Sequence, residues 1–265
     1  ALNHCVVALA ALGWQAKVHR FPNSADPTHL AALELYSYPA AELDVSLAAA
    51  IPRRRTDRRH YSSWPVPRGD VALMGARAAH TGVLMRRVTD LDGLAGLLAD
   101  AAARHRSDQE YLAELAEWSG RYAATAGVPA RNVPGPDGQP RIPARNLGAG
   151  VLTQPPHTDP AEEHAVVMAL GTLDDDPMAR LRAGEATSIV LLTATALGLA
   201  SCPITEALEV GETRAALREE LFGADAHPQM LLRVGWAPVN ADPLPPTPRR
   251  DLSEVVAYLD GSPLE

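Results

Sequence analysis

The chain has 265 residues, a formal net charge of −8 and 46% hydrophobic residues, a composition typical of a globular protein with its own core. It excludes bulk disorder and a membrane-spanning helix, and the acidic balance argues against a general nucleic-acid binder, which needs a basic face. The only two cysteines, Cys5 and Cys202, exclude a disulfide framework and favour a cytoplasmic location.

Apolar periodicity predicts helices and strands in mixed order along the chain. Helices are expected over residues 1–13, 41–51, 70–80, 90–106, 107–119, 177–198, 212–221 and 253–259. Strands are expected over residues 16–21, 30–35, 82–88, 164–171 and 229–236. The helical pattern begins at Ala1 with no polar N-cap before it, so we expect that the front of this unit is missing.

Residues 127–160 are rich in Pro, Gly and Asn and show no periodicity. A segment of this length is typical of a lid, a binding loop or a linker. A second feature is an internal similarity: residues 1–13 and residues 186–198 are both predicted as Ala-rich helices that end at glycine. This similarity suggests that the chain contains two versions of one helical unit.

The common catalytic signatures are absent from the sequence. There is no G-x-G-x-x-G, Walker A, G-x-S-x-G, H-E-x-x-H or C-x-x-C motif. A Rossmann-type dehydrogenase, a nucleotide hydrolase, a serine hydrolase and a zinc enzyme thus lack their signatures, and we name no catalytic or metal-ligating residue. The three aspartates before Pro177 are interpreted as a helix N-terminus, because proline favours the first helical position.

Three motifs remain, each with two interpretations. The run Arg53–Arg59 is either a solvated basic loop or a site for a phosphate ester. Arg249 and Arg250 follow a proline-rich segment that would hold them in place. The stretch from Gly198 to Thr205 is either a turn that approaches a flat ligand or a plain helix end with Cys202 in the core.

The residues Arg54–Arg58 resemble the R-R-[ST]-x-R signature of flavin-dependent nitroreductases. The longer stretch Ile51–Pro67 is more similar to the Acg family of FMN-binding oxidoreductases of actinobacteria. Further matches are LRAGEATSIVLLTATALGLASCPITEALE from Leu181 and PPTPRRDL from Pro245. The family's R-A-P-S-x-x-N-x-Q-P-W stretch does not occur in the sequence, and His60-Tyr61 stands where Pro-Phe is usual.

The resemblance implies an α+β nitroreductase-like fold, a mixed and mostly antiparallel sheet flanked by helices. It also implies two fused pseudo-symmetric units, the first of them truncated. Residues 1–50 would be the remainder of the first unit and residues 51–265 the second, with 127–160 as a possible lid. The assembly would be a homodimer or a pseudo-dimeric monomer.

The resemblance further implies an FMN site. Arg54, Thr56 and Arg58 would hold the phosphate and ribityl chain, supported by Arg55, and Arg249 or Arg250 would be a second phosphate clamp. The isoalloxazine ring would lie near five consecutive residues, Ser201, Cys202, Pro203, Ile204 and Thr205. The expected reaction passes hydride from NAD(P)H through flavin N5 to a quinone or nitroaromatic acceptor. The alternatives are an FMN-storage protein with a lid over the flavin, and an interaction module without a ligand.

Overall fold

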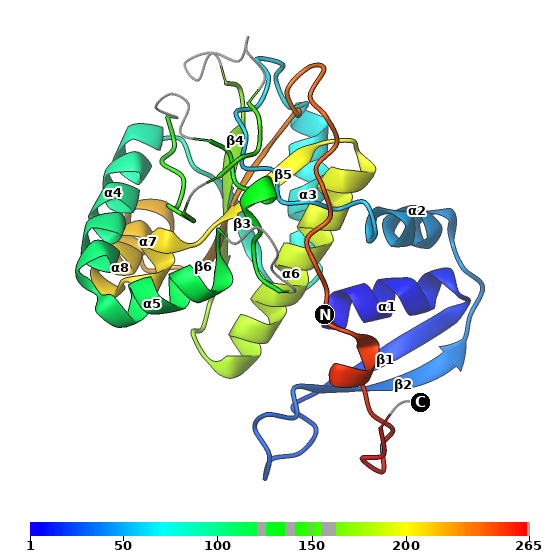
Figure 1. Ribbon diagram of the computed structural model, residues 1–265. Coiled ribbons are helices and arrows are strands. Elements are labelled where there is room, and N and C mark those ends of the chain that lie inside the picture. Colours follow the sequence, from blue (N-terminus) through cyan, green and yellow to red (C-terminus); the bar gives the residue numbers. More distant parts are fainter. Residues whose placement is uncertain (121–125, 136–140, 149, 155–162, 264–265) are drawn as a thin grey trace.

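A four-stranded antiparallel sheet forms the centre of the computed structural model, which describes residues 1–120, 126–135, 141–148, 150–154 and 163–263 (Figure 1). Its strand order is β3-β4-β6-β5, with bounds β3 (Leu84–Arg87), β4 (Val166–Thr172), β5 (Ala200–Ile204) and β6 (His227–Gly235). Helices flank this sheet, which confirms the predicted α+β class. Within the described residues, no helix is long and apolar enough to cross a membrane.

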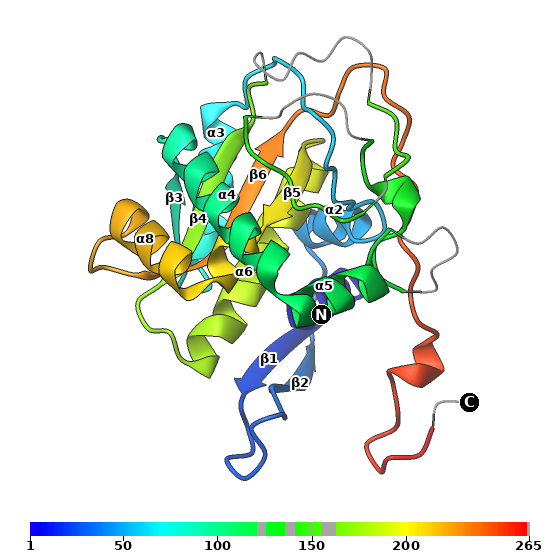
Figure 2. The same cartoon turned by 60° about the vertical axis from the view of Figure 1, so that its left-hand side comes forward.

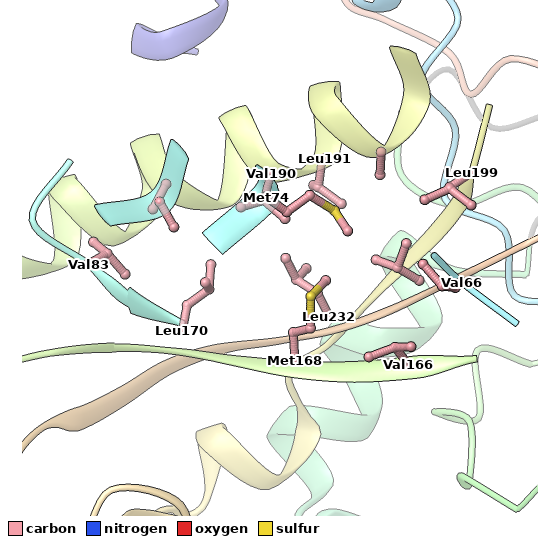
Figure 3. Packing of buried hydrophobic residues seen from close by; sticks show 14 residues of the cluster. Val66, Met74, Val83, Val166, Met168, Leu170, Val190, Leu191, Leu199 and Leu232 are labelled. Carbon is pink, nitrogen blue, oxygen red and sulfur yellow. The ribbon is translucent and has the colours of Figure 1, made fainter. Parts of the chain in front are cut away.

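Both faces of the sheet are covered by helices. One face packs against α3 (Arg68–Ala79) and α6 (Pro177–Ala196), and the other against α4 (Leu91–Ser107), α7 (Glu206–Glu209) and α8 (Gly211–Leu221). Successive side chains of a strand point to opposite faces. Met168 and Leu170 therefore point toward α6 (Figure 3), whereas Val167 and Ala169 join the second cluster. All seven residues of β4 are buried as a result.

The first fifty residues form a smaller group of elements beside α6. They comprise α1 (Leu2–Ala11), the antiparallel hairpin of β1 (Trp14–Arg20) and β2 (Ala31–Ser37), and α2 (Glu42–Ala50). Val7, Leu47 and Ala50 pack with Leu192 of α6 in a cluster of their own. The two-unit organisation and the boundary at residue 50 remain predictions.

The structure corrects two sequence predictions. The stretch after Gly198 is not a turn: α6 ends there with a φ of +81°, and residues Ala200–Ile204 pair with β6 as an edge strand. Pro203 is compatible with an edge strand, where one side of the backbone needs no ladder partner. The predicted last helix over 253–259 is only a 3₁₀ turn, Leu252–Glu254, because its apolar side chains are exposed and pack on no core.

Asp175 joins the start of α6 to α8 and β6. It accepts hydrogen bonds from Arg214 Nη1 and Nη2 at 2.7 and 2.8 Å, and from Gln229 Nε2 at 3.0 Å. The hydrogen bonds from Arg214 hold the pKa of Asp175 well below its usual range. This carboxylate therefore stabilises the fold above the pKa of an unfolded aspartate, and the contribution disappears as the pH falls toward the folded pKa.

We expect Asp175→Asn to lower the free energy of unfolding by about 1–2 kcal/mol at pH 7, since one charge-assisted pair is lost. Urea unfolding at pH 7 and pH 3 measures the free energy of unfolding of the wild type and the variant. The difference between wild type and variant should shrink at pH 3, and an equal difference at both pH values would contradict the linkage.

Candidate functional site

The arginine-rich motif lies along the free edge of β5. Thr56 forms a parallel bridge with Ser201, and the Asp57 N–H donates to the Ser201 carbonyl oxygen at 2.9 Å. The segment Arg54–Arg58 and the stretch Ser201–Thr205 are 143 or more residues apart in sequence, yet they pair side by side. The structure thus brings together two of the three predicted motifs.

The arginines of the motif differ in their partners. Arg59 is buried and its charge is offset by Asp57, with Nε and Nη2 contacts of 3.0 and 2.9 Å. Arg54, Arg55 and Arg58 form no ion pair with any described carboxylate. Asp57 therefore divides the run into one structural arginine and a group of cations available to an anion.

The third motif also contributes a positive charge to this region. Burial, together with the charges of Arg249 and Arg55, lowers the pKa of Arg54. Arg249 is exposed, and its Nη1 donates to the carbonyl oxygens of Thr247 and Pro248 at 3.1 and 3.0 Å. Arg250 is exposed beside it. We name Arg54, Arg55, Arg58 and Arg249 the cationic cluster.

A cavity of about 1080 Å³ opens beside β5. Of the predicted site residues, six line it: Thr56, Arg58, Cys202, Pro203, Ile204 and Thr205. Five lie outside its wall: Arg54, Arg55, Ser201, Arg249 and Arg250. Ser201 is buried, and its Oγ has no hydrogen-bond partner among the described residues. Burial raises the pKa of the Cys202 thiol, which keeps it protonated and unreactive at neutral pH.

The helix α5 (Gln109–Trp118) and the loop that follows it also line the cavity. The position of α5 in the fold is seen in Figure 2. The described parts of the segment predicted as a lid contribute mostly apolar or glycine positions: Gly127, Val128, Val133, Pro134, Gly135, Ile142, Pro143, Ala144 and Leu147. The rest of that segment, at 136–140, 149 and 155–160, lies outside the described residues. The apolar periodicity of residues 107–119 predicts an amphipathic helix, but it does not show that this helix lines a cavity.

A buried charge network supports the β5 side of the cavity, and sequence reasoning missed it. Arg233 of β6 is 6% exposed and lines the cavity. Its Nη1 lies 3.2 Å from Glu163 Oε1, its Nη2 donates to the Arg59 carbonyl oxygen at 2.7 Å, and its guanidinium lies 4.2 Å from the Tyr61 ring centroid. The available signal was an arginine next to the apolar residues Met230–Leu232 and Val234 of β6, since a buried charge requires partners.

Gly127 closes the loop against the end of α5. Its φ is +82°, and a Cβ at this position would lie 2.2 Å from the Trp118 carbonyl oxygen, which accepts from Val128 N–H at 2.8 Å. We expect Gly127→Ala to cost at least about 1–2 kcal/mol from left-handed strain and to displace this wall. Thermal unfolding measures the loss. Gly96→Ala is the matched control, because Gly96 is an exposed residue of α4 and a Cβ at this position would have no atom within 4 Å. Equal melting temperatures for the two variants would contradict the close approach of residue 127 to the Trp118 carbonyl oxygen.

No protein-family model matches the chain. "Putative NAD(P)H nitroreductase Rv3131" of Mycobacterium tuberculosis is 61% identical over 97% of this chain and 75% of its own length. The chain belongs to the nitroreductase superfamily. "Putative NAD(P)H nitroreductase acg" of the same organism, 34% identical over 96% of this chain and 77% of its own length, places it with the Acg-type nitroreductases.

Solved nitroreductases share the fold. The FMN-dependent nitroreductase NfnB from Mycobacterium smegmatis, solved in complex with NADPH, superposes with a TM-score of 0.51 at 21% identity. The alignment covers 82% of this chain and 99% of NfnB. A nitroreductase with bound FMN from Desulfitobacterium hafniense gives a TM-score of 0.51 at 13% identity, over 81% of this chain and 98% of that one. These likenesses confirm the nitroreductase fold of the chain.

Proposed function

We propose that this chain binds FMN and acts as an NAD(P)H-dependent oxidoreductase of the nitroreductase type. The observation that carries the proposal is a cationic cluster without carboxylate partners, in the described residues, next to a cavity large enough for a flavin. The names of the M. tuberculosis relatives and the FMN and NADPH in the titles of the solved nitroreductases support it.

The cationic cluster fits a phosphate monoester. Burial, and after it the charges of Arg249 and Arg55, lower the pKa of Arg54. An anion bound beside Arg54 would offset the charges of Arg249 and Arg55, and guanidinium groups bind phosphate through paired hydrogen bonds. The buried Nε of Arg55, which has no hydrogen-bond partner in the described structure, is a further donor for such an anion.

The cavity fits a planar ring. Its β5 wall, Cys202–Thr205, contributes small and apolar side chains, and the lining from residues 127–154 is mostly apolar, with Arg145 and Gln154 as its polar members. Such walls exclude water from a bound ring. The pairing of Asp57 with Arg59, and of Arg233 with Glu163, holds the motif loop against β5 without using the cationic cluster.

When bound, FMN supplies hydride transfer between NAD(P)H and an acceptor of the quinone or nitroaromatic class. The chain's own part is to bind the phosphate, to hold the ring against β5 and to exclude water. These roles agree with a sequence that carries none of the common triad or metal motifs.

A second candidate function is FMN storage. The wall formed by α5 and residues 126–135 and 141–148 favours it, because a segment folded over the ring would block the approach of a nicotinamide. The two functions share the FMN site and differ only in access to the flavin face.

The test is anaerobic addition of NADPH to the FMN-loaded protein. Oxidoreductase activity predicts that the visible flavin bands bleach in the time of manual mixing. Bands that persist with NADPH and with NADH, while dithionite bleaches them, would contradict turnover and favour storage. Size-exclusion chromatography with light scattering separates the two proposed assemblies, a homodimer and a pseudo-dimeric monomer.

A further inference from the structure

Tyr111 presents a buried hydroxyl that the rest of the described structure leaves without a partner. It lies in the first turn of α5 and lines the cavity, and its hydroxyl oxygen has no hydrogen bond. A buried polar group without a hydrogen bond costs free energy, so nearly all such groups in native proteins are satisfied. An unsatisfied hydroxyl in a cavity wall is therefore suited to a ligand.

The Tyr111 ring is fixed in place by its neighbours. It stacks on the His105 ring, with centroids 3.9 Å apart and an interplanar angle of 10°, and the Arg145 guanidinium lies 5.9 Å from its centroid. His105 Nδ1 lies 3.4 Å from Glu206 Oε1, and Arg145 donates to Thr205 Oγ1 at 3.1 Å. With both neighbours anchored to the β5–α7 corner, the hydroxyl has a defined direction.

The hydroxyl is a donor for a neutral acceptor. Burial raises the pKa of Tyr111, which keeps the proton on its oxygen at neutral pH. Arg145 is already paired with Glu209, so it adds little attraction for an anion. A carbonyl or nitro oxygen accepts a hydrogen bond without bringing a net charge into this corner.

The surroundings of the hydroxyl define the rest of the ligand. Leu115 and Trp118 follow Tyr111 by four and seven residues, line the same cavity, and so share its face of α5. Ile142 and Pro143 add apolar surface from the loop. These side chains offer apolar surface to a flat ligand body, whereas the charged residues of the same lining that act on Tyr111 are Glu114, Arg145, Glu206 and Glu209.

We propose that Tyr111 is a specificity-determining residue, whose hydroxyl donates a hydrogen bond to a carbonyl or nitro oxygen of a flat aromatic ligand in this cavity. The inference rests on the proposed function where it identifies this ligand as the electron acceptor. The hydrogen bond from Tyr111 depends only on the cavity and does not require electron transfer.

Tyr111→Phe tests the proposal, because it keeps the stacked ring and removes only the hydroxyl. The probes are 1,4-naphthoquinone and naphthalene, which have the same flat body with and without carbonyl oxygens, titrated by calorimetry into FMN-treated protein. We expect the variant to bind 1,4-naphthoquinone about 3- to 10-fold more weakly and naphthalene equally well. Tyr38→Phe, at an exposed tyrosine outside the cavity, should change neither affinity.

An unchanged affinity for 1,4-naphthoquinone, or an equal loss for both probes, would overturn the proposal. The melting temperature confirms that the variant folds, and we expect no decrease, since an unsatisfied polar group is removed. FMN content is measured on the same samples. Protein that retains no FMN contradicts the proposed function, whereas the difference between the two probes still decides the role of Tyr111.

Discussion

The double substitution of Arg54 and Arg58 by alanine is expected to abolish tight FMN binding. Both guanidiniums lack carboxylate partners among the described residues, and Arg54 is held next to Arg249 and Arg55, whose charges contribute to its lowered pKa. Charge-assisted hydrogen bonds to phosphate are each worth about 1.5–3 kcal/mol, so we expect the affinity for FMN to fall about 100-fold or more.

Flavin absorbance after desalting measures this loss, and equilibrium titration with FMN gives its size. The control is the double variant Arg53→Ala, Arg68→Ala, which removes the same charge from two exposed arginines outside the cavity wall. Retention of FMN by the Arg54/Arg58 variant at the wild-type level would show that the motif is a solvated loop.

The second large effect is expected at Arg233. Replacing it by methionine keeps much of the apolar volume but leaves Glu163 buried without the guanidinium, with the His60 Nδ1 at 3.7 Å beside it, and the Arg59 carbonyl without this donor. Breaking a buried ion pair from one side costs about 3–5 kcal/mol, which lowers the melting temperature of a chain of this size by on the order of 10 °C.

Arg104→Met is the matched control for this change. Arg104 pairs with Glu212 at 3.2 Å, but the two side chains are 55% and 68% exposed. Exposed pairs contribute at most about 1 kcal/mol, so this variant should melt close to the wild type. Similar melting temperatures for the two variants would contradict a stabilising role for the buried network.

Local patterns were sufficient to predict most of the helices and strands. The apolar run of β4 and the Asp-Pro start of α6 identify these elements correctly, because burial on both faces and helix capping leave clear marks in the sequence. The strand β5 was missed, since Ala-Ser-Cys-Pro-Ile has weak strand propensity and its pairing with β6 is a long-range contact.

The candidate site was predictable only in part. The arginine motif and the stretch after Gly198 were found as separate sequence features, and their pairing through Thr56 and Ser201 is a property of the fold. Sequence periodicity cannot tell which apolar face of α5 lines a cavity and which faces the core, so Tyr111 was not singled out. Arg233 was missed because its partners come from two distant segments, the loop with Arg59 and Tyr61 and the residue Glu163.

The most direct test of the account is the visible absorption spectrum of the purified protein after incubation with FMN and removal of unbound flavin. A flavin site made by the cationic cluster and the cavity predicts flavin bands that remain with the protein in stoichiometric amount. A colourless protein after this treatment would contradict the proposed FMN site.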